Sequence, residues 1–113
     1  MNKVFRRRDY PDKEKKLRSD VEMEYQLFRQ KMLHKTSEEV YENCCRIRFY
    51  ECVHEYFIYK EEISSEIVNG CYMESSLLQK LWQVYLKYEA TEVTSWEEIE
   101  IMIEVYIARC KEE

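Results

Sequence analysis

Glycine and proline are almost absent from this chain of 113 residues, which contains one of each. Hairpin turns, glycine-rich phosphate-binding loops and doubly wound sheets all need residues that tolerate positive φ. The composition therefore disfavours all-β folds and nucleotide-binding loops. No apolar run approaches the roughly 18 residues that a membrane-spanning helix needs. The basic N-terminus has no apolar segment behind it, so we expect no secretory signal and no membrane partner.

Histidine and paired cysteines are also scarce. The chain has two histidines, and its five cysteines are odd in number. Cys44, Cys45 and Cys52 fall within one predicted helix, where the chain cannot bend back to pair them. We therefore expect free cysteines, with Cys45 and Cys52 buried as small apolar side chains, and a cytoplasmic protein.

Charge, in contrast, is abundant and unevenly distributed. Charged residues make up 36% of the chain, and the formal net charge is −5. Residues 1–18 hold eight basic and three acidic residues, whereas the remainder holds 10 basic and 20 acidic residues. We therefore divide the chain into a basic N-terminal arm at 1–18, ordered or flexible, and a single acidic helical domain at 19–113.

Apolar residues recur at helical spacing after residue 20 and predict an all-α domain. Capping-box pairs mark three helix starts: Ser19 with Glu22, Thr36 with Glu39, and Thr94 with Glu97. The predicted elements are main helices near 19–34, 37–61 and 74–90, a fourth after Thr94, and a short helical turn over 63–70. That turn should stop at Asn69-Gly70, where positive φ is cheap. Residues 99–107 also alternate like a strand, but their length and cap favour a helix.

We expect a small orthogonal or bundle-like domain with the helix at 37–61 in its centre. Its core should consist of the apolar side chains that share one face of each predicted helix. These are Tyr41, Cys45, Cys52, Tyr56, Leu78, Leu81, Trp82, Tyr85, Ile99, Ile103 and Tyr106. Ten tyrosines exceed what such a core can bury, so some should lie at its rim, either facing water or forming an interface.

Catalytic and metal-binding patterns are weak. Glu51-x-x-His54 has the Glu-x-x-His spacing of di-iron bundles, which need two copies of that motif. The second copy is missing, because Lys31 stands three residues before His34 in place of a glutamate. Cys52 and His54 are two residues apart on one helix, so they point about 200° away from each other and form no dyad. We therefore expect a protein without catalytic residues, metal or cofactor.

Two charged regions remain as candidate binding sites. Four glutamates of the last predicted helix form an acidic face that is either merely solvated or bound by a basic partner protein: Glu97, Glu98, Glu100 and Glu104. The basic residues of the arm could contact nucleic acid, although the acidic domain beside them would repel phosphate. They are Arg6, Arg7, Arg8, Lys13, Lys15, Lys16 and Arg18.

The order of several motifs resembles a family of small helical proteins of unknown function from low-GC Gram-positive bacteria and their mobile elements. The motifs, between about residues 20 and 107, are Thr36-Ser37-Glu38-Glu39-Val40-Tyr41, Ile63-Ser64-Ser65-Glu66, Leu77-Leu78 and Trp96-Glu97-Glu98. Cys44-Cys45 and Tyr85-Leu86-Lys87 stand where family members have Ala-Tyr-Glu and Trp-Leu-Lys. The resemblance implies a mobile-element setting and no mechanism.

Charge and setting together favour a non-enzymatic protein-interaction module. By analogy with anti-CRISPR proteins, it would be an acidic inhibitor or regulator of a nucleic-acid-processing protein. The alternative is a regulator that binds nucleic acid through residues 3–18. Deleting residues 1–18 should spare partner binding in the first case and abolish nucleic-acid binding in the second. The sequence leaves the oligomeric state open.

Overall fold

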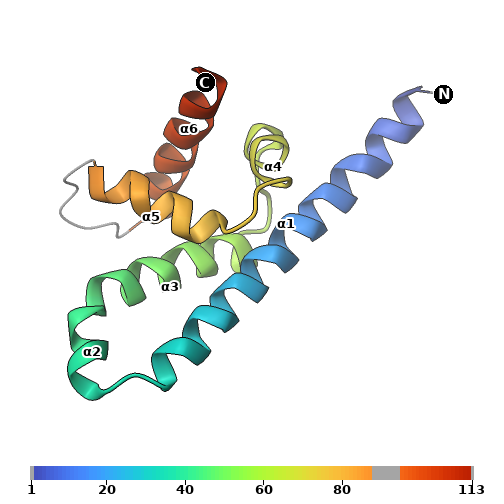
Figure 1. The fold of residues 1–113 in the computed structure, drawn as a ribbon. Helices are drawn as coiled ribbons and strands as arrows, with labels where there is room; N and C mark the ends of the chain where they lie inside the picture. The colour runs from blue at the N-terminus through green and yellow to red at the C-terminus, as the bar shows by residue number, and fades with distance from the viewer. Residues whose placement is uncertain (1, 88–94, 113) are drawn as a thin grey trace.

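The computed structural model describes residues 2–87 and 95–112, with side chains from 12 to 87 and from 95 to 110. These ranges form six helices and contain no strand (Figure 1). The helices are α1 (Asn2–Leu33), α2 (Ser37–Glu42), α3 (Cys44–Tyr59), α4 (Ser65–Cys71), α5 (Leu77–Lys87) and α6 (Trp96–Glu112). The predicted all-α fold class is confirmed, and residues 99–107 are helical.

Two long helices, α1 and α3, form the frame of the domain. They diverge like the arms of a V, and α2 connects the end of α1 to the start of α3 (Figure 1). Helix α1 packs against α3, α4 and α5, and α6 packs against α3, α4 and α5. The core therefore lies where α4, α5 and α6 close over the two frame helices.

Five predicted core residues are fully buried: Tyr56, Leu78, Leu81, Ile99 and Ile103. Cys52, Trp82, Tyr85 and Tyr106 are partly buried against this core. The prediction is wrong for Tyr41, which is 78% exposed, and for Cys45, which is also exposed. Both lie near the α2–α3 junction, and α2 packs mainly against α3.

The predicted single helix at 37–61 is broken at Asn43. The Asn43 amide donates to the backbone carbonyl of Glu39 at 2.8 Å, and its backbone N–H points to the carbonyls of Glu39 and Val40. Such local bonds compete with a regular helix. The start at Ser37 is as predicted, because the Thr36 hydroxyl accepts from the Glu39 N–H and the Glu39 carboxylate accepts from the Thr36 N–H.

Helix α1 begins at Asn2 rather than near residue 19, and it passes through Pro11 without interruption. Proline lacks an N–H, so the bond to the carbonyl of Arg7 cannot form, yet the helix continues on both sides of it. Ser19 lies inside α1 and is no N-cap. The predicted boundary between residues 18 and 19 therefore coincides with no helix end.

The single glycine lies inside α4, so the predicted stop at Asn69-Gly70 is wrong. Gly70 has negative φ, and α4 continues to Cys71. A Cβ added at Gly70 would lie 2.6 Å from the Cδ1 atom of Ile107 on α6. A side chain at this position would force Ile107 to shift, so the glycine serves the close packing of the Ile107 side chain and not a special backbone conformation.

Helix α5 begins at Leu77, three residues after the predicted start, and a residue from another helix caps it. The Glu24 carboxylate on α1 accepts from the backbone N–H groups of Leu78 and Gln79, at 2.8 and 3.1 Å.

The predicted end of α5 at residue 90 and the predicted cap Thr94 lie outside the described residues. At the start of α6, the Ser95 hydroxyl accepts from the Glu98 N–H at 3.2 Å.

Candidate functional site

The four glutamates predicted as an acidic face lie in α6 but do not all share one side. Glu97, Glu100 and Glu104 fall within about 60° around the helix axis, whereas Glu98 points about 100° away from Glu97. Glu97 and Glu104 are exposed, and the Glu100 side chain is 28% exposed. The first three residues therefore form one side of α6.

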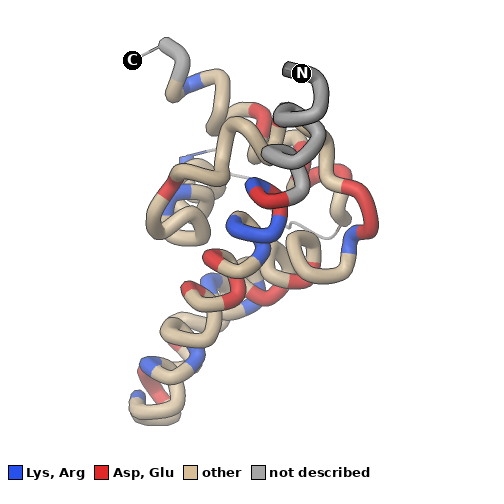
Figure 2. Tube along the Cα trace, turned by 90° about the vertical axis from the view of Figure 1, so that its right-hand side faces the viewer, with Lys and Arg blue, Asp and Glu red and all other residues tan. Residues whose placement is uncertain are grey.

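Other segments bring further carboxylates to this side of α6. One hollow is lined by Glu14, Lys60, Glu61, Glu62 and Glu100, and a second by Glu66, Asn69 and Glu104. The hollows adjoin, since Glu104 follows Glu100 by one helical turn and α4 packs on α6. Figure 2 shows acidic positions on several neighbouring segments. We define the acidic surface as Glu61, Glu62, Glu66, Glu100 and Glu104.

Lys60 is the one basic side chain among the described residues that line these hollows. Its Nζ atom lies 3.8 Å from Glu100 Oε1 and 6.0 Å above the ring centre of Tyr56. Burial raises the pKa of Tyr56 strongly, and the nearby carboxylates of Glu100 and Glu104 raise it further. The Tyr56 hydroxyl therefore stays protonated. Lys60 pairs with Glu100, and among the described residues no ion pair joins the other four carboxylates of the acidic surface to a basic side chain.

Sequence reasoning missed Glu61, Glu62 and Glu66, because only the α4–α6 contact brings them beside Glu100. Their local signal is a pair of glutamates before a predicted turn. Two glutamates before a turn are equally frequent in a loop that is merely solvated. Only the packing of helices that are far apart in the sequence distinguishes a shared acidic surface from such a loop.

The candidate nucleic-acid residue Arg18 contacts the protein's own backbone. Its guanidinium donates to the carbonyls of Phe57 at 2.7 Å and Lys60 at 2.8 Å, and it pairs with Glu14 at 3.1 Å. The last carbonyls of a helix have no intrahelical donor. Arg18 therefore caps the C-terminus of α3, and its charge favours that end of the helix dipole.

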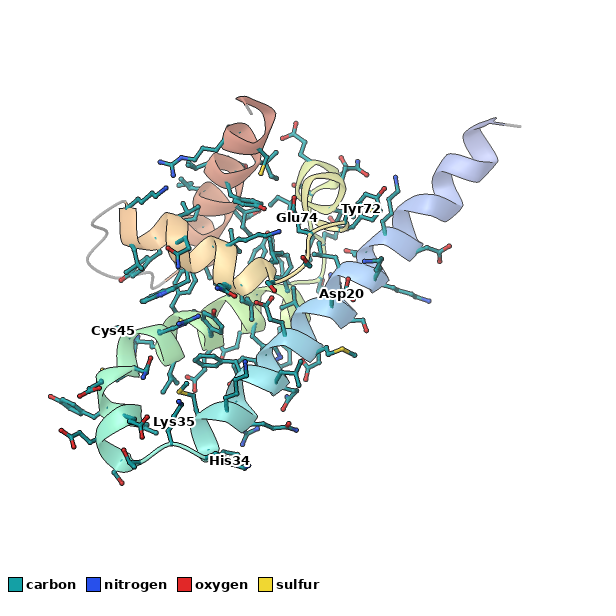
Figure 3. All side chains as sticks on the ribbon, viewed as in Figure 1. Asp20, His34, Lys35, Cys45, Tyr72 and Glu74 are labelled. Atoms are coloured by element: carbon teal, nitrogen blue, oxygen red, sulfur yellow. The ribbon has the colours of Figure 1, made fainter. Side chains whose placement is uncertain are left out.

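Two lysines of the same group also contact other parts of the protein. Lys16 donates to Asp20 at 2.7 Å and to the Tyr72 carbonyl at 2.9 Å, and Lys13 lies 4.9 Å above the Tyr72 ring. Figure 3 shows Tyr72 and Asp20 near this part of α1. Lys15 is exposed. The backbone of Arg6, Arg7 and Arg8 belongs to α1, and their side chains lie outside the described residues.

His54 takes part in a contact between α1 and α3. Its Nε2 atom bonds to the Glu22 carboxylate, and the Tyr25 ring stacks on the imidazole with 4.1 Å between centroids. This bond is the main reason why the pKa of Glu22 is lowered. Both contacts join α1 to α3, so the arrangement holds these two helices together.

The cysteines are free, and Cys71 is fully buried. Burial raises the pKa of Cys71 to about 12. Cys44, Cys45 and Cys110 are exposed and Cys52 is half-buried, so the predicted burial is wrong for Cys45 and holds only in part for Cys52. Within the described residues, no cluster of His, Cys, Asp or Glu is suited to hold a metal ion.

Comparisons of the chain with protein-family models, curated proteins and solved structures give no match. The resemblance to a Gram-positive family therefore stays a prediction. A membrane-spanning helix, which needs both length and an apolar surface, does not occur in the described part of the chain.

Proposed function

We propose that the chain is a non-enzymatic protein-interaction module whose acidic surface binds a basic surface of a partner protein. The observation that carries the proposal is the convergence of glutamates from the α3–α4 loop, α4 and α6 on two neighbouring hollows, whose described lining residues include one lysine. Carboxylates held this close repel one another, and a cationic partner relieves that repulsion.

The charge also favours a class of partner. A surface of closely spaced carboxylates carries the same sign of charge as a nucleic-acid backbone, so it is complementary to the basic groove of a nucleic-acid-processing protein. We propose such a protein as the partner and inhibition or regulation as the consequence, in the manner of anti-CRISPR proteins. The chain would then compete with nucleic acid for that groove.

The alternative, nucleic-acid binding through residues 3–18, has less support. Lys13, Lys16 and Arg18 already contact groups of the protein itself. Deleting residues 1–18 would also remove Leu17, which is 2% exposed, and the Arg18 cap. A variant with alanine at the three consecutive arginines of α1 is therefore the better test of this alternative. Loss of DNA affinity in a folded variant would support it.

The main proposal is tested by reversing charges that have no structural role. Glu61, Glu62 and Glu104 are exposed, and none is in an ion pair among the described residues. Glu100 is left unchanged because it pairs with Lys60. The wild type and the triple variant E61K/E62K/E104K are used as bait in an extract of the native host, after nuclease treatment, and the bound proteins are eluted with excess duplex DNA.

We expect the wild type to retain a basic nucleic-acid-binding protein that duplex DNA releases, and the triple variant to lose it. A matched control is E42K/E51K/E55K, which reverses three exposed glutamates on α2 and α3. The control should retain the same protein. If both triple variants and the wild type retain it equally, or if DNA does not release it, the proposed function is wrong.

A further inference from the structure

A further hollow is lined by residues of α1 and α3, two helices that diverge toward the end of α1 (Figure 1). The start of α5 borders it, and its volume of about 430 Å³ is within the range of ligand-binding clefts. Its basic side chains are Lys31, Lys35 and Arg46, and Glu24 is its one carboxylate. Figure 3 shows Lys35 extending from the loop after α1 toward α3. We call this region the basic cleft.

The positive charge of the basic cleft is only partly compensated. Both carboxylate oxygens of Glu24 accept hydrogen bonds from backbone N–H groups at the start of α5. The negative charge of Glu24 is therefore already engaged by the N-terminus of α5. Lys35 lies 3.7 Å from Glu39 on the adjoining α2. Lys31 is exposed and has no ion-pair partner among the described residues. The cleft therefore attracts an anionic group.

Arg46 gives the cleft a fixed donor. Its guanidinium lies 5.7 Å from the ring centre of Phe28 and 5.2 Å from that of Tyr50, and its Nη2 atom donates to the Tyr50 hydroxyl at 2.9 Å. The Nε–H is buried and has no hydrogen-bond partner in the described part of the chain. A buried donor without an acceptor is costly, and a bound anion or a water molecule would satisfy it.

An apolar strip continues from the basic cleft along α1. A neighbouring hollow shares Glu24, Leu27 and Ser76 with the cleft and adds two methionines. Its other carboxylates, Asp20 and Glu74, are already paired with Lys16 and Lys80. Met23 is 62%, Leu27 55% and Met73 75% exposed. Methionine adapts its shape and is frequent on peptide-binding surfaces. Ser76, at the junction of the two hollows, has φ of 53°, a strained value of the kind found at binding sites.

We propose that the basic cleft and this apolar strip bind an acidic amphipathic segment of a partner protein. A carboxylate of the segment would pair with Lys31 and Arg46, and its apolar side chains would cover Met23, Leu27 and Met73. Charge complementarity selects an anionic group for the basic cleft. The exposed apolar strip then favours a protein segment, because a free inorganic anion would leave that strip uncovered. The proposal is independent of the acidic surface, which lies on other elements.

The test uses a library of random 12-residue peptides displayed on phage, selected on the full chain. We expect enriched peptides in which an acidic residue stands near several apolar ones. Their affinity, measured by fluorescence polarisation, should fall about 10-fold or more in K31E and in R46K, because charge-assisted hydrogen bonds are lost. M73E should weaken the same peptides. The variant K15E, on the same helix but outside the cleft, should bind as the wild type does.

Thermal unfolding of each variant confirms that it is folded before affinities are compared. Three outcomes overturn the proposal: no enriched peptides, enriched peptides without acidic residues, or equal losses in K31E and K15E. Displacement of the peptides by millimolar inorganic phosphate, with no effect of M73E, would assign the cleft to a free anion instead. A concentration-dependent dimer of the wild type that K31E abolishes would identify a second copy as the occupant and would also overturn it.

Discussion

Replacing Arg18 by alanine tests whether this basic residue serves the fold rather than a partner. Its guanidinium makes its two shortest backbone hydrogen bonds, at 2.7 and 2.8 Å, to carbonyls at the C-terminus of α3. A charge-assisted hydrogen bond contributes about 1.5–3 kcal/mol, and a cation at a helix C-terminus about 0.3–1 kcal/mol. The Arg18 side chain is 23% exposed, so in the variant water can form some of the hydrogen bonds that the guanidinium made to these carbonyls. We expect R18A to lose about 2–4 kcal/mol of unfolding free energy.

The assay is urea denaturation followed by far-UV circular dichroism. R18K should lie between R18A and the wild type, because an ammonium keeps the charge but cannot serve several carbonyls as the planar guanidinium does. K15A, a change at an exposed lysine of the same helix, should stay within about 0.5 kcal/mol of the wild type. If R18A is as stable as K15A, the capping role is refuted and Arg18 returns to the set of candidate nucleic-acid residues.

Three further predictions concern single contacts. The lowered pKa of Glu22, caused first by its bond to His54, stabilises the fold only while the carboxylate is ionised. The stability difference between wild type and E22Q should therefore be full above about pH 4.5 and vanish as the pH falls through the lower folded-state pKa, in urea titrations. G70A should lose about 1–3 kcal/mol because its Cβ meets Ile107, and I107V should relieve part of this loss. Iodoacetamide should alkylate Cys71 only after unfolding, because burial raises its pKa to about 12; labelling in the folded protein, read by mass spectrometry, would contradict this.

The parts of the fold that depend on local chemistry could be predicted from the sequence. The absence of turn formers and the helical periodicity indicated an all-α domain. The Thr36 capping box gave the start of α2 to the residue, since both of its bonds join residues three positions apart. Tyr56, Leu78 and Ile103 were recognised as core because they lie on the apolar side of their helices.

The errors arose where distant contacts decide. The uneven charge suggested an arm at 1–18, yet the segment is helical up to Leu33, and Leu17 and Arg18 of the predicted arm contact distant parts of the fold. Gly70 was interpreted as a helix stop, although its role depends on Ile107 in another helix. The acidic surface was recognised only through its α6 members, because the glutamates before and within α4 join it through tertiary packing.

The central claim, that the acidic surface is a binding surface, is tested most directly by the salt dependence of affinity for the protein captured with the wild-type bait. The dissociation constant of the wild type should rise steeply with salt, because its association is driven by complementary charge. The folded variant E61K/E62K/E104K should bind at least about 10-fold more weakly at low salt and respond little to added salt. Equal affinity and equal salt dependence of the two proteins would contradict the account.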